Sequence, residues 1–395
     1  MNKNDIKLGV KTLKVKYHNC YVGTLALTNH GKVAFSYDNE WLETGFSISP
    51  FSLPLESKVF VPNNYIFDGL FGIFADSLPD AWGRLLLDKM LKEHGIQKDI
   101  TVLDRLALVG KNGMGALEYE PDYVLGEEVV LKNIDYLAEQ CQKLLRAEYS
   151  EEVDLLYKMG GSSGGARPKI LTNIDSKDWI IKFPAHVDSK DIGYQEYLYS
   201  KCAKECYINM TETKLFSSES CKGYFGTVRF DRIEKDDKKY KIHTASAAGL
   251  LEADYKAPCM DYHTLMKLTR ILTRENKEDL ENMFRRMCFN VFAHNRDDHA
   301  KNFSFLYDEQ IAGWRLSPAY DLTYSNTYFG EHTTSVDGNG ANPGEKEILN
   351  VGIKAGMKKK DCISIMEQVK ECVLRDLKVY LEYRESMVSR SPARW

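Results

Sequence analysis

The stretch that decides the fold is Asn295-Arg296-Asp297-Asp298-His299-Ala300-Lys301-Asn302, and Ser317-Pro318-Ala319-Tyr320-Asp321 follows it after a strand-like run. Asp297 lies five residues before Asn302, and Asp321 adds a second carboxylate farther along the chain. Carboxylate and amide oxygens are ligands that Mg²⁺ accepts, and a carboxylate beside a hydroxyl group can act as a base. The pattern therefore predicts a base at Asp297 and metal ligands at Asn302 and Asp321.

The five-residue spacing is typical of phosphotransferases. The catalytic loop of protein kinases reads H-R-D-x-x-x-x-N, in which the Asp faces the acceptor hydroxyl and the Asn holds Mg²⁺. Asp and Asn are also common in ordinary loops, so the interpretation depends on a phosphate-binding loop and a lysine farther upstream.

Composition sets the limits within which this site must fit. The chain has 395 residues, 43% hydrophobic and 28% charged, which is typical of a globular protein with two or three domains. Its net charge of -4 argues against nucleic-acid or membrane binding through bulk charge alone. Nine scattered cysteines, no apolar leader and no apolar run of about 20 residues predict a cytoplasmic protein with reduced thiols.

The order of expected elements is β-rich first and α-rich later. Alternation over residues 13–49 predicts a small antiparallel sheet. A helix is expected after Ser77-Leu78-Pro79-Asp80, with Asp80 facing its N-terminus. The later expectations are strands at Lys169–Thr172 and Trp179–Phe183, a hairpin of Tyr224–Ile233 with Lys239–Ala245 across the charged turn Glu234–Lys238, and helices at Asp261–Leu272, Lys277–Ala293 and Lys360–Met387. The pattern indicates an α+β fold with a site between its two halves.

A glycine-rich loop, Gly160-Gly161-Ser162-Ser163-Gly164-Gly165-Ala166-Arg167-Pro168-Lys169, joins an expected helix to an expected strand. Small residues let backbone N–H groups approach phosphate oxygens closely. It is not a Walker A loop, because Ala166 stands where that motif requires lysine. A flexible linker is the alternative interpretation.

Lys182 favours the phosphate interpretation, because it is the lone lysine in the apolar strand Trp179–Phe183. A strand lysine shortly after a glycine loop is how kinases neutralise nucleotide phosphates. Glu196 in the next helix is a candidate to orient it, although a solvent-facing helical Glu is the commoner case. The end of the strand at Val228-Arg229-Phe230 is either the segment that binds adenine or an ordinary core strand, and the sequence leaves both open.

Together these motifs resemble the HipA-type serine/threonine kinases, the toxins of HipA/HipB toxin–antitoxin pairs. The resemblance covers nearly the whole chain and includes Phe74–Arg84, the glycine loop, Arg229–Arg232, Asp297–Phe303 and Ser317–Asp321. It implies a bilobal kinase-like fold related to lipid kinases, with a β-rich N-terminal subdomain and an all-helical C-terminal lobe. The expected division is residues 1–125 for the N-terminal subdomain, 126–245 for the small lobe and 246–395 for the catalytic lobe.

The resemblance also implies roles for individual residues. Asp297 is the catalytic base, Asn302 and Asp321 bind Mg²⁺, and Ser162 is the autophosphorylated residue, with the adjacent Ser163 as the alternative. The residues that it implies for ATP binding are Gly164, Gly165, Ala166, Arg167, Pro168, Lys169, Lys182, Val228, Arg229, Phe230, His299, Ala300, Lys301, Asn302, Tyr320 and Asp321. Two departures are Arg167-Pro168, where some members carry Gln-Glu, and Leu322 after Asp321, which removes a DFG-type switch.

The resemblance implies a toxin that phosphorylates a protein such as an aminoacyl-tRNA synthetase or another translation factor. It also implies a HipB-like helix-turn-helix antitoxin as partner, which would supply the contacts to operator DNA. The alternatives are a small-molecule phosphotransferase and a non-catalytic corepressor that acts through the antitoxin. The C-terminal Arg390, Arg394 and Trp395 are either DNA contacts or, more simply, a frayed basic tail.

Overall fold

The computed structural model describes residues 8–96, 100–123, 133–235, 238–327 and 330–382. Contacts divide the chain into two compact units, the first made of Met1–Gly193, Lys214–Ala253 and Leu306–Ala312. The second unit is made of Tyr194–Thr213, Asp254–Phe305 and Gly313–Trp395. The chain therefore passes between the units more than once, within α7 (Ile192–Glu205), β8 (Thr213–Phe216) and β14 (Ser304–Asp308).

The first unit begins with the antiparallel sheet expected from the alternating residues, in the strand order β4-β3-β2-β1-β5. Every second residue of β1 is buried, because successive side chains point to opposite faces of a strand. The strands of this sheet are β1 (Thr12–Tyr17), β2 (Cys20–Leu27), β3 (Val33–Tyr37), β4 (Val59–Phe60) and β5 (Leu117–Glu120). The same unit also contains the helices α1 (Asn39–Thr44), α2 (Gly72–Ala75), α4 (Val102–Val109) and α8 (Ala247–Leu251).

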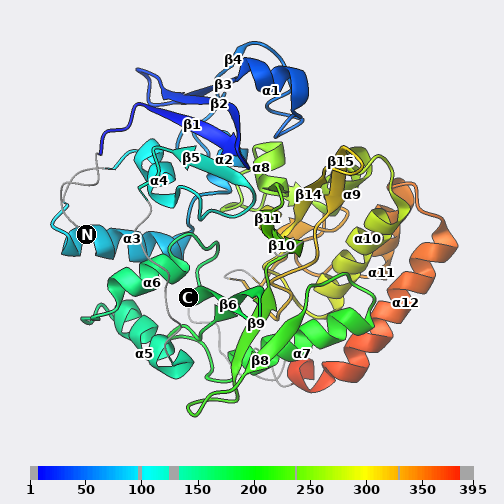
Figure 1. Cartoon of the computed structure of the whole chain (residues 1–395). Helices are drawn as coiled ribbons and strands as arrows, with labels where there is room; N and C mark the ends of the chain where they lie inside the picture. The colour runs from blue at the N-terminus through cyan, green and yellow to red at the C-terminus, as the bar shows by residue number, and fades with distance from the viewer. Residues whose placement is uncertain (1–7, 97–99, 124–132, 236–237, 328–329, 383–395) are drawn as a thin grey trace, which may run out of the picture. The chain divides into compact units, whose positions relative to one another are not determined.

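A second sheet in this unit carries the predicted phosphate-binding strands. Its order is β6-β7-β9-β8, with β6 (Lys169–Ile174), β7 (Lys177–Lys182) and β9 (Tyr224–Val228) paired antiparallel. Helices α3 (Ala81–Glu93), α5 (Ile134–Leu145) and α6 (Val153–Gly160) share one apolar core with it, and α3 lies beside α6 (Figure 1). The fully buried Trp82, Leu86, Leu156, Ile170 and Ile181 belong to this core.

The predicted hairpin of Tyr224–Ile233 with Lys239–Ala245 is wrong in its extent. Strand β9 pairs with β7, and only β10 (Arg232–Lys235) and β11 (Lys238–Lys241) form a hairpin, before the short strand β12 (Thr244–Ser246). The extended pairing is interrupted because Arg229 and Asp231 turn inward to form a buried ion pair. The predicted turn at Glu234–Lys238 includes residues 236 and 237, which lie outside the described residues.

The second unit is mainly helical, as expected, but it is not all-helical. Its helices α9 (Tyr262–Leu272), α10 (Lys277–Phe292), α11 (Glu345–Lys354) and α12 (Lys359–Asp376) pack through buried apolar side chains such as Phe284, Met287 and Val369. Short strands β13 (Met260–Asp261) and β16 (Thr334–Ser335) pair in parallel, and β15 (Gly313–Leu316) follows β14. The expected helix beyond residue 382, together with Arg390 and Arg394, lies outside the described residues.

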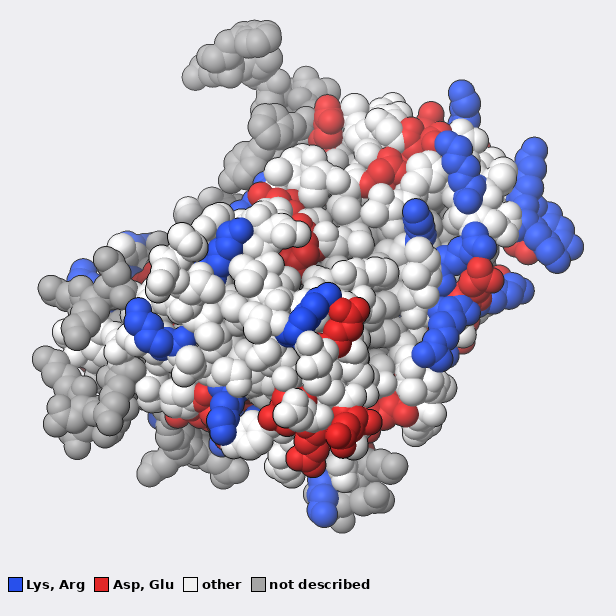
Figure 2. Space-filling view, turned by 90° about the horizontal axis from the view of Figure 1, so that it is seen from above, with Lys and Arg blue, Asp and Glu red and all other residues white. Residues whose placement is uncertain are grey.

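All nine cysteines are free; Cys202 lies in the last turn of α7 and Cys206 directly follows that helix, and both side chains are buried. In the part of the chain that the structure describes, no helix is both long enough and apolar enough to cross a membrane. Figure 2 shows one face of the molecule, on which basic side chains lie close to acidic ones in several places. The three-part domain division given by the sequence stays a prediction.

Candidate active site

The glycine loop connects α6 to β6, as the sequence predicted, and its two serines differ in environment. Ser163 is 2% exposed, and its hydroxyl donates to the carbonyl of Gly160 at 2.6 Å. The backbone N–H of Ser163 donates to the same carbonyl at 3.1 Å. Ser162 is half-buried and therefore the more accessible serine. Gly165 has φ +83°, a conformation that side chains disfavour, so glycine is required there.

Two lysines lie directly opposite each other on β6 and β7, the two strands that follow this loop. Lys169 in β6 is paired in register with Lys182 in β7, so both side chains lie on the same face. The Lys169 ammonium donates to the carbonyl of Gly164 in the loop, and the Lys182 ammonium lies 5.6 Å from the centre of the Phe225 ring. Like charges at directly opposite positions disfavour each other, and a polyphosphate held there would relieve that repulsion.

Two further predicted ATP-binding residues already have protein partners. The Arg167 guanidinium makes two bonds to the carboxylate of Asp188, at 3.0 and 3.2 Å. At the predicted adenine-binding segment, the backbone N–H of Arg229 donates to the carbonyl of Asp178 at 2.8 Å. The Arg229 backbone N–H therefore already has a protein acceptor.

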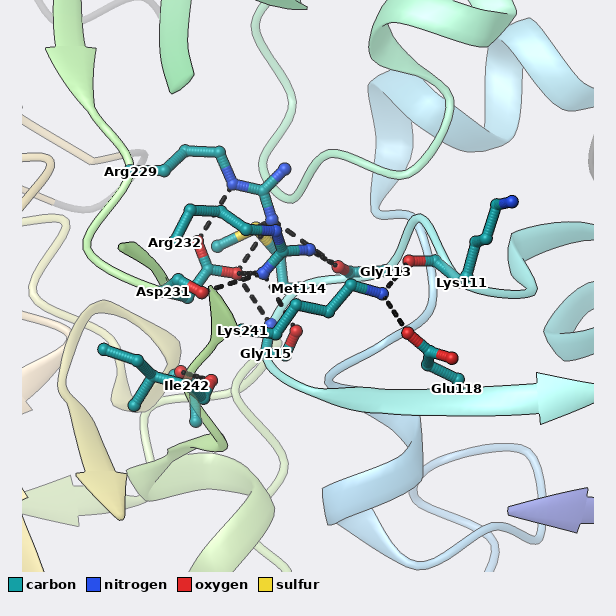
Figure 3. Close-up of polar contacts among 11 residues, drawn as sticks. Lys111, Gly113, Met114, Gly115, Glu118, Arg229, Asp231, Arg232, Lys241 and Ile242 are labelled. Atoms are coloured by element: carbon teal, nitrogen blue, oxygen red, sulfur yellow. Dashed lines mark hydrogen bonds and ion pairs between the residues drawn. The ribbon is translucent and has the colours of Figure 1, made fainter. Parts of the chain in front are cut away.

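The side chain of Arg229 belongs to a buried charge cluster, drawn in Figure 3, whose structural role the sequence did not reveal. Asp231 is fully buried and accepts bonds from Arg229 at 2.8 and 2.9 Å and from Arg232 at 2.7 Å. It also accepts the backbone N–H of Gly115 at 2.8 Å, while Arg232 donates to the carbonyl of Gly113 at 2.8 Å. The cluster fastens the turn before β5 to the start of β10, so it is a structural anchor.

The ionisation of this cluster follows from its charges. Burial alone would raise the pKa of Asp231, but the neighbouring Arg229 and Arg232 outweigh burial and lower it to about 2. Burial and the adjacent Arg229 lower the pKa of Arg232 to about 10, so both groups stay charged at neutral pH. Lys241 and Glu118 add an ion pair beside the cluster (Figure 3).

The predicted catalytic loop, in the second unit, presents Asp297 to solvent and bonds Asn302 to its own backbone. The Asp297 side chain is 56% exposed, and one of its carboxylate oxygens lies 3.8 Å from Nε2 of His299. The Asn302 side-chain amide donates to the backbone carbonyl of Asp297 at 2.7 Å. Because its NH₂ group is used in this way, Asn302 has its oxygen, the atom that Mg²⁺ binds, on the other side of the amide.

Asp298, the neighbour of the predicted base, is the residue that fixes this loop. The sequence motif predicted no role for it. It is completely buried and accepts bonds from the Tyr262 hydroxyl at 2.9 Å, His332 Nδ1 at 2.9 Å and the Thr334 backbone N–H at 3.0 Å. Asn290 donates to the Tyr262 hydroxyl at 2.9 Å and extends the network. Burial and the Asp298 carboxylate raise the pKa of Tyr262 well above its ordinary value, so its proton stays in this network. The only signal in the sequence was the doubled acid at positions 297 and 298.

The remaining predicted residues of this unit gather around the same loop. The Tyr320 hydroxyl donates to the carbonyl of Lys301 at 2.6 Å and lies 2.6 Å from the Ser304 hydroxyl. These bonds bring the segment that ends in Asp321 beside the segment that ends in Asn302. Lys301 and His299 also face one ring, since the Lys301 ammonium is 4.5 Å from the centre of Tyr255 and the His299 ring is 5.8 Å away.

Asp321 has an unusual backbone conformation, with φ +54°. Its carbonyl accepts a bond at 3.3 Å from Asn295, which itself is 2% exposed. Left-handed conformations at residues other than glycine carry strain and often occur at functional sites, although Asp adopts them more readily than most residues.

The oxygen donors of the two predicted metal ligands suit Mg²⁺. Asn302 and Asp321 offer one amide oxygen and one carboxylate, and Mg²⁺ usually binds one or two such groups while phosphate oxygens and water complete its octahedron. Among the residues that the structure describes, no group of three or more His, Cys, Asp or Glu side chains is arranged to hold a metal ion. The predicted residues thus form two groups, one in each unit. Glu196 of α7 is 4% exposed and belongs to the second unit.

The fold resembles a solved structure over almost its full length. A chain from the structure titled Shewanella oneidensis MR-1 toxin antitoxin system HipA, HipB and its operator DNA complex aligns with 97% of this chain and 92% of its own. The TM-score is 0.70 at 18% sequence identity. The mixed arrangement of helices and sheets is therefore a HipA-like fold.

The sequence comparisons identify the family. The HipA N-terminal domain matches residues 13–120, and the HipA-like C-terminal domain matches residues 161–377, more than half of the chain. The chain belongs to the HipA family, which confirms the resemblance seen in the sequence. Two relatives from Sinorhizobium fredii, named "Putative kinase" Y4mE and Y4dM, are 24% and 22% identical. The matches cover 81% and 83% of this chain and 78% and 81% of those proteins.

Proposed function

We propose that this chain is an ATP- and Mg²⁺-dependent serine/threonine protein kinase, the toxin of a toxin–antitoxin pair. The observation that carries the proposal is the geometry of the 297–302 loop. It combines a solvent-facing Asp297 carboxylate with an Asn302 whose amide is locked to the Asp297 carbonyl. The paired Lys169 and Lys182 support the assignment, since phosphoryl transfer depends mainly on positioning and charge stabilisation.

In the proposed reaction each side chain has one task. Lys169 and Lys182 stabilise the phosphate charge, and Asn302 and Asp321 hold Mg²⁺, which offsets the charge of the β- and γ-phosphates when bound. Asp297 orients a Ser or Thr hydroxyl and accepts its proton while the hydroxyl oxygen bonds to the γ-phosphorus. The bond from that phosphorus to the bridging oxygen breaks, and ADP leaves with the bonding electrons.

Autophosphorylation at Ser162 is part of the proposal. The hydroxyl of Ser163 is buried and bonded to Gly160, whereas Ser162 is partly accessible, which favours Ser162 as the acceptor. A phosphate dianion on this loop would repel the phosphates of ATP and thereby silence the kinase.

Mass spectrometry of the purified protein after incubation with Mg²⁺ and ATP tests the assignment. One phosphate on the peptide with Ser162 and Ser163, absent in Asp297→Ala, is the expected result. Binding of Mg²⁺-ATP without phosphate on this chain or on added proteins, but with transfer to sugars or antibiotics, would replace the proposal with a small-molecule phosphotransferase.

A second proposed role is partner binding. The similar Shewanella chain was solved with HipB and its operator DNA, and this supports a HipB-like antitoxin as the partner of this chain. The antitoxin would contact the DNA, because the net charge of this chain is -4. Adding the chain to antitoxin bound to operator DNA should raise the affinity of that complex, and unchanged affinity would remove the corepressor role.

A further inference from the structure

The start of helix α3 holds the glycine loop, although some 80 residues separate the two in sequence. From its position after Pro79, Asp80 is expected to face the N-terminus of its own helix. It occupies the N-cap position but makes no side-chain bond to the N–H groups of α3. Its Oδ2 instead accepts the backbone N–H of Gly165 at 2.9 Å.

Trp82 holds the far end of the same loop. Its ring is 1% exposed, and its Nε1 donates to the carbonyl of Lys169, the first residue of β6, at 3.1 Å. Its backbone N–H also reaches the carbonyl of Gly165, at 3.4 Å. The loop is therefore held by a charge-assisted bond that the Asp80 carboxylate accepts and by a bond that the buried Trp82 indole donates.

Gly83 allows the loop to approach at its beginning. A Cβ atom at this position would lie 2.7 Å from the carbonyl oxygen of Gly161, closer than atoms pack, so only glycine fits without a shift. Asp80, Trp82 and Gly83, which we call the α3 clasp, thus touch the loop at its beginning, its middle and its end.

The bond from Gly165 to Asp80 bears on how the loop serves ATP. A backbone N–H that donates to a carboxylate is not at the same time a donor to phosphate. In this conformation Gly165 therefore contributes to the shape of the loop, and the phosphate charge falls to Lys169 and Lys182.

We propose that Asp80 is a positioning residue of the nucleotide site. By accepting the Gly165 N–H it fixes the glycine loop. That loop carries Ser162, and its Gly164 carbonyl accepts a hydrogen bond from the Lys169 ammonium. The inference deepens the proposed kinase function and rests on it for its effect on ATP. The holding of the loop itself is measurable without nucleotide.

The first test is hydrogen exchange of the nucleotide-free full-length chain, followed on peptides that cover residues 160–169. In Asp80→Ala the Gly165 amide loses a charge-assisted bond, so its exchange should accelerate by about 10-fold to 100-fold. Asp80→Asn keeps an acceptor oxygen and should lie close to wild type. Asp88→Ala is the matched control, because Asp88 lies on the same helix, is 62% exposed and pairs with Arg105. Unchanged exchange in Asp80→Ala would overturn the clasp.

The second test is Mg²⁺-ATP binding and the KM for ATP in the same variants. A loop that the nucleotide must first order binds that nucleotide more weakly. Asp80→Ala should therefore raise the dissociation constant of Mg²⁺-ATP and the KM for ATP by about 10-fold each, and change kcat much less. Tighter binding in Asp80→Ala would show that Asp80 competes with phosphate and would contradict the positioning role. If wild type binds no nucleotide, the proposed kinase function fails, while the exchange experiment still decides whether Asp80 holds the loop.

Discussion

The two loops to which the sequence assigns the nucleotide chemistry are held in different ways. The glycine loop is held from outside, by Asp80 and Trp82 of a distant helix, through its backbone N–H and carbonyl groups. The catalytic loop is held from within, by the buried carboxylate of its own Asp298, which gathers donors from Tyr262, His332 and Thr334.

The difference shows what each loop can do. A loop whose buried Asp298 carboxylate accepts three hydrogen bonds keeps one geometry, which suits a base and its metal ligands. A loop fixed at a few backbone contacts can be released when one of them is lost or when charge is added to it. This contrast favours our proposal that a phosphate on Ser162 would act on the glycine loop.

Replacing Asp297 should give the largest effect and separate chemistry from binding. In Asp297→Ala and Asp297→Asn, phosphate transfer should fall by about 10²-fold to 10⁴-fold, because the base is lost. Binding of Mg²⁺-ATP, measured by calorimetry, should change little, since Lys169 and Lys182 remain. Retained turnover in either variant would remove Asp297 from its proposed role.

Replacing the adjacent Asp298 tests the internal hold. Asp298→Ala leaves the buried Tyr262, His332 and Thr334 donors without their acceptor and should reduce the free energy of unfolding by about 3 to 5 kcal/mol. Asp297→Ala, one residue away but more than half exposed, should cost less than about 0.5 kcal/mol in the same urea titration. Equal losses in the two variants would contradict the contrast between the loops.

The two serines of the glycine loop provide a smaller test. Ser162→Ala should abolish the phosphate on this peptide and leave stability nearly unchanged. Ser163→Ala should keep the phosphate and lose about 1 kcal/mol, because its buried hydroxyl donates to Gly160. Peptide mapping and thermal melting of both variants measure these effects. Phosphate that persists in Ser162→Ala would move the acceptor to Ser163.

Glu252 extends the comparison to a carboxylate outside both loops. It accepts the backbone N–H of Gly72 at 2.9 Å, and burial raises its pKa from 4.5 to about 7. The native state therefore keeps a proton that the unfolded chain loses. The stability contributed by this group is complete below about pH 4.5 and is lost as the pH rises through 7. Melting temperatures should show a decrease over this range that Glu252→Gln lacks; a decrease of the same size in the variant would exclude Glu252 as its source.

Much of the architecture could be predicted because local pattern determines it. Alternation gave the N-terminal sheet, the Pro79-Asp80 pair marked the start of α3, and the glycine loop lies between a helix and a strand as expected. The hairpin after Tyr224 was predicted too long, because the sequence does not show that Arg229 and Asp231 pair inside the protein. The all-helical lobe was too simple. Strands β14 and β15 occupy the strand-like run between Asn302 and Ser317, and β13 and β16 are only two residues long, which is too short for a periodicity to be detected.

By itself the sequence determined the family, the spacing of Asp297, Asn302 and Asp321, and the position of the glycine loop before Lys182. These features depend on residue type and separation along one segment, which a sequence displays directly. Only the tertiary structure decided that Asp80 serves Gly165 and not its own helix, that Asp298 is the buried support of Asp297, and that Lys169 lies opposite Lys182. The physical reason is that hydrogen-bond partners and burial depend on which distant segments meet, and that is settled by packing the whole chain.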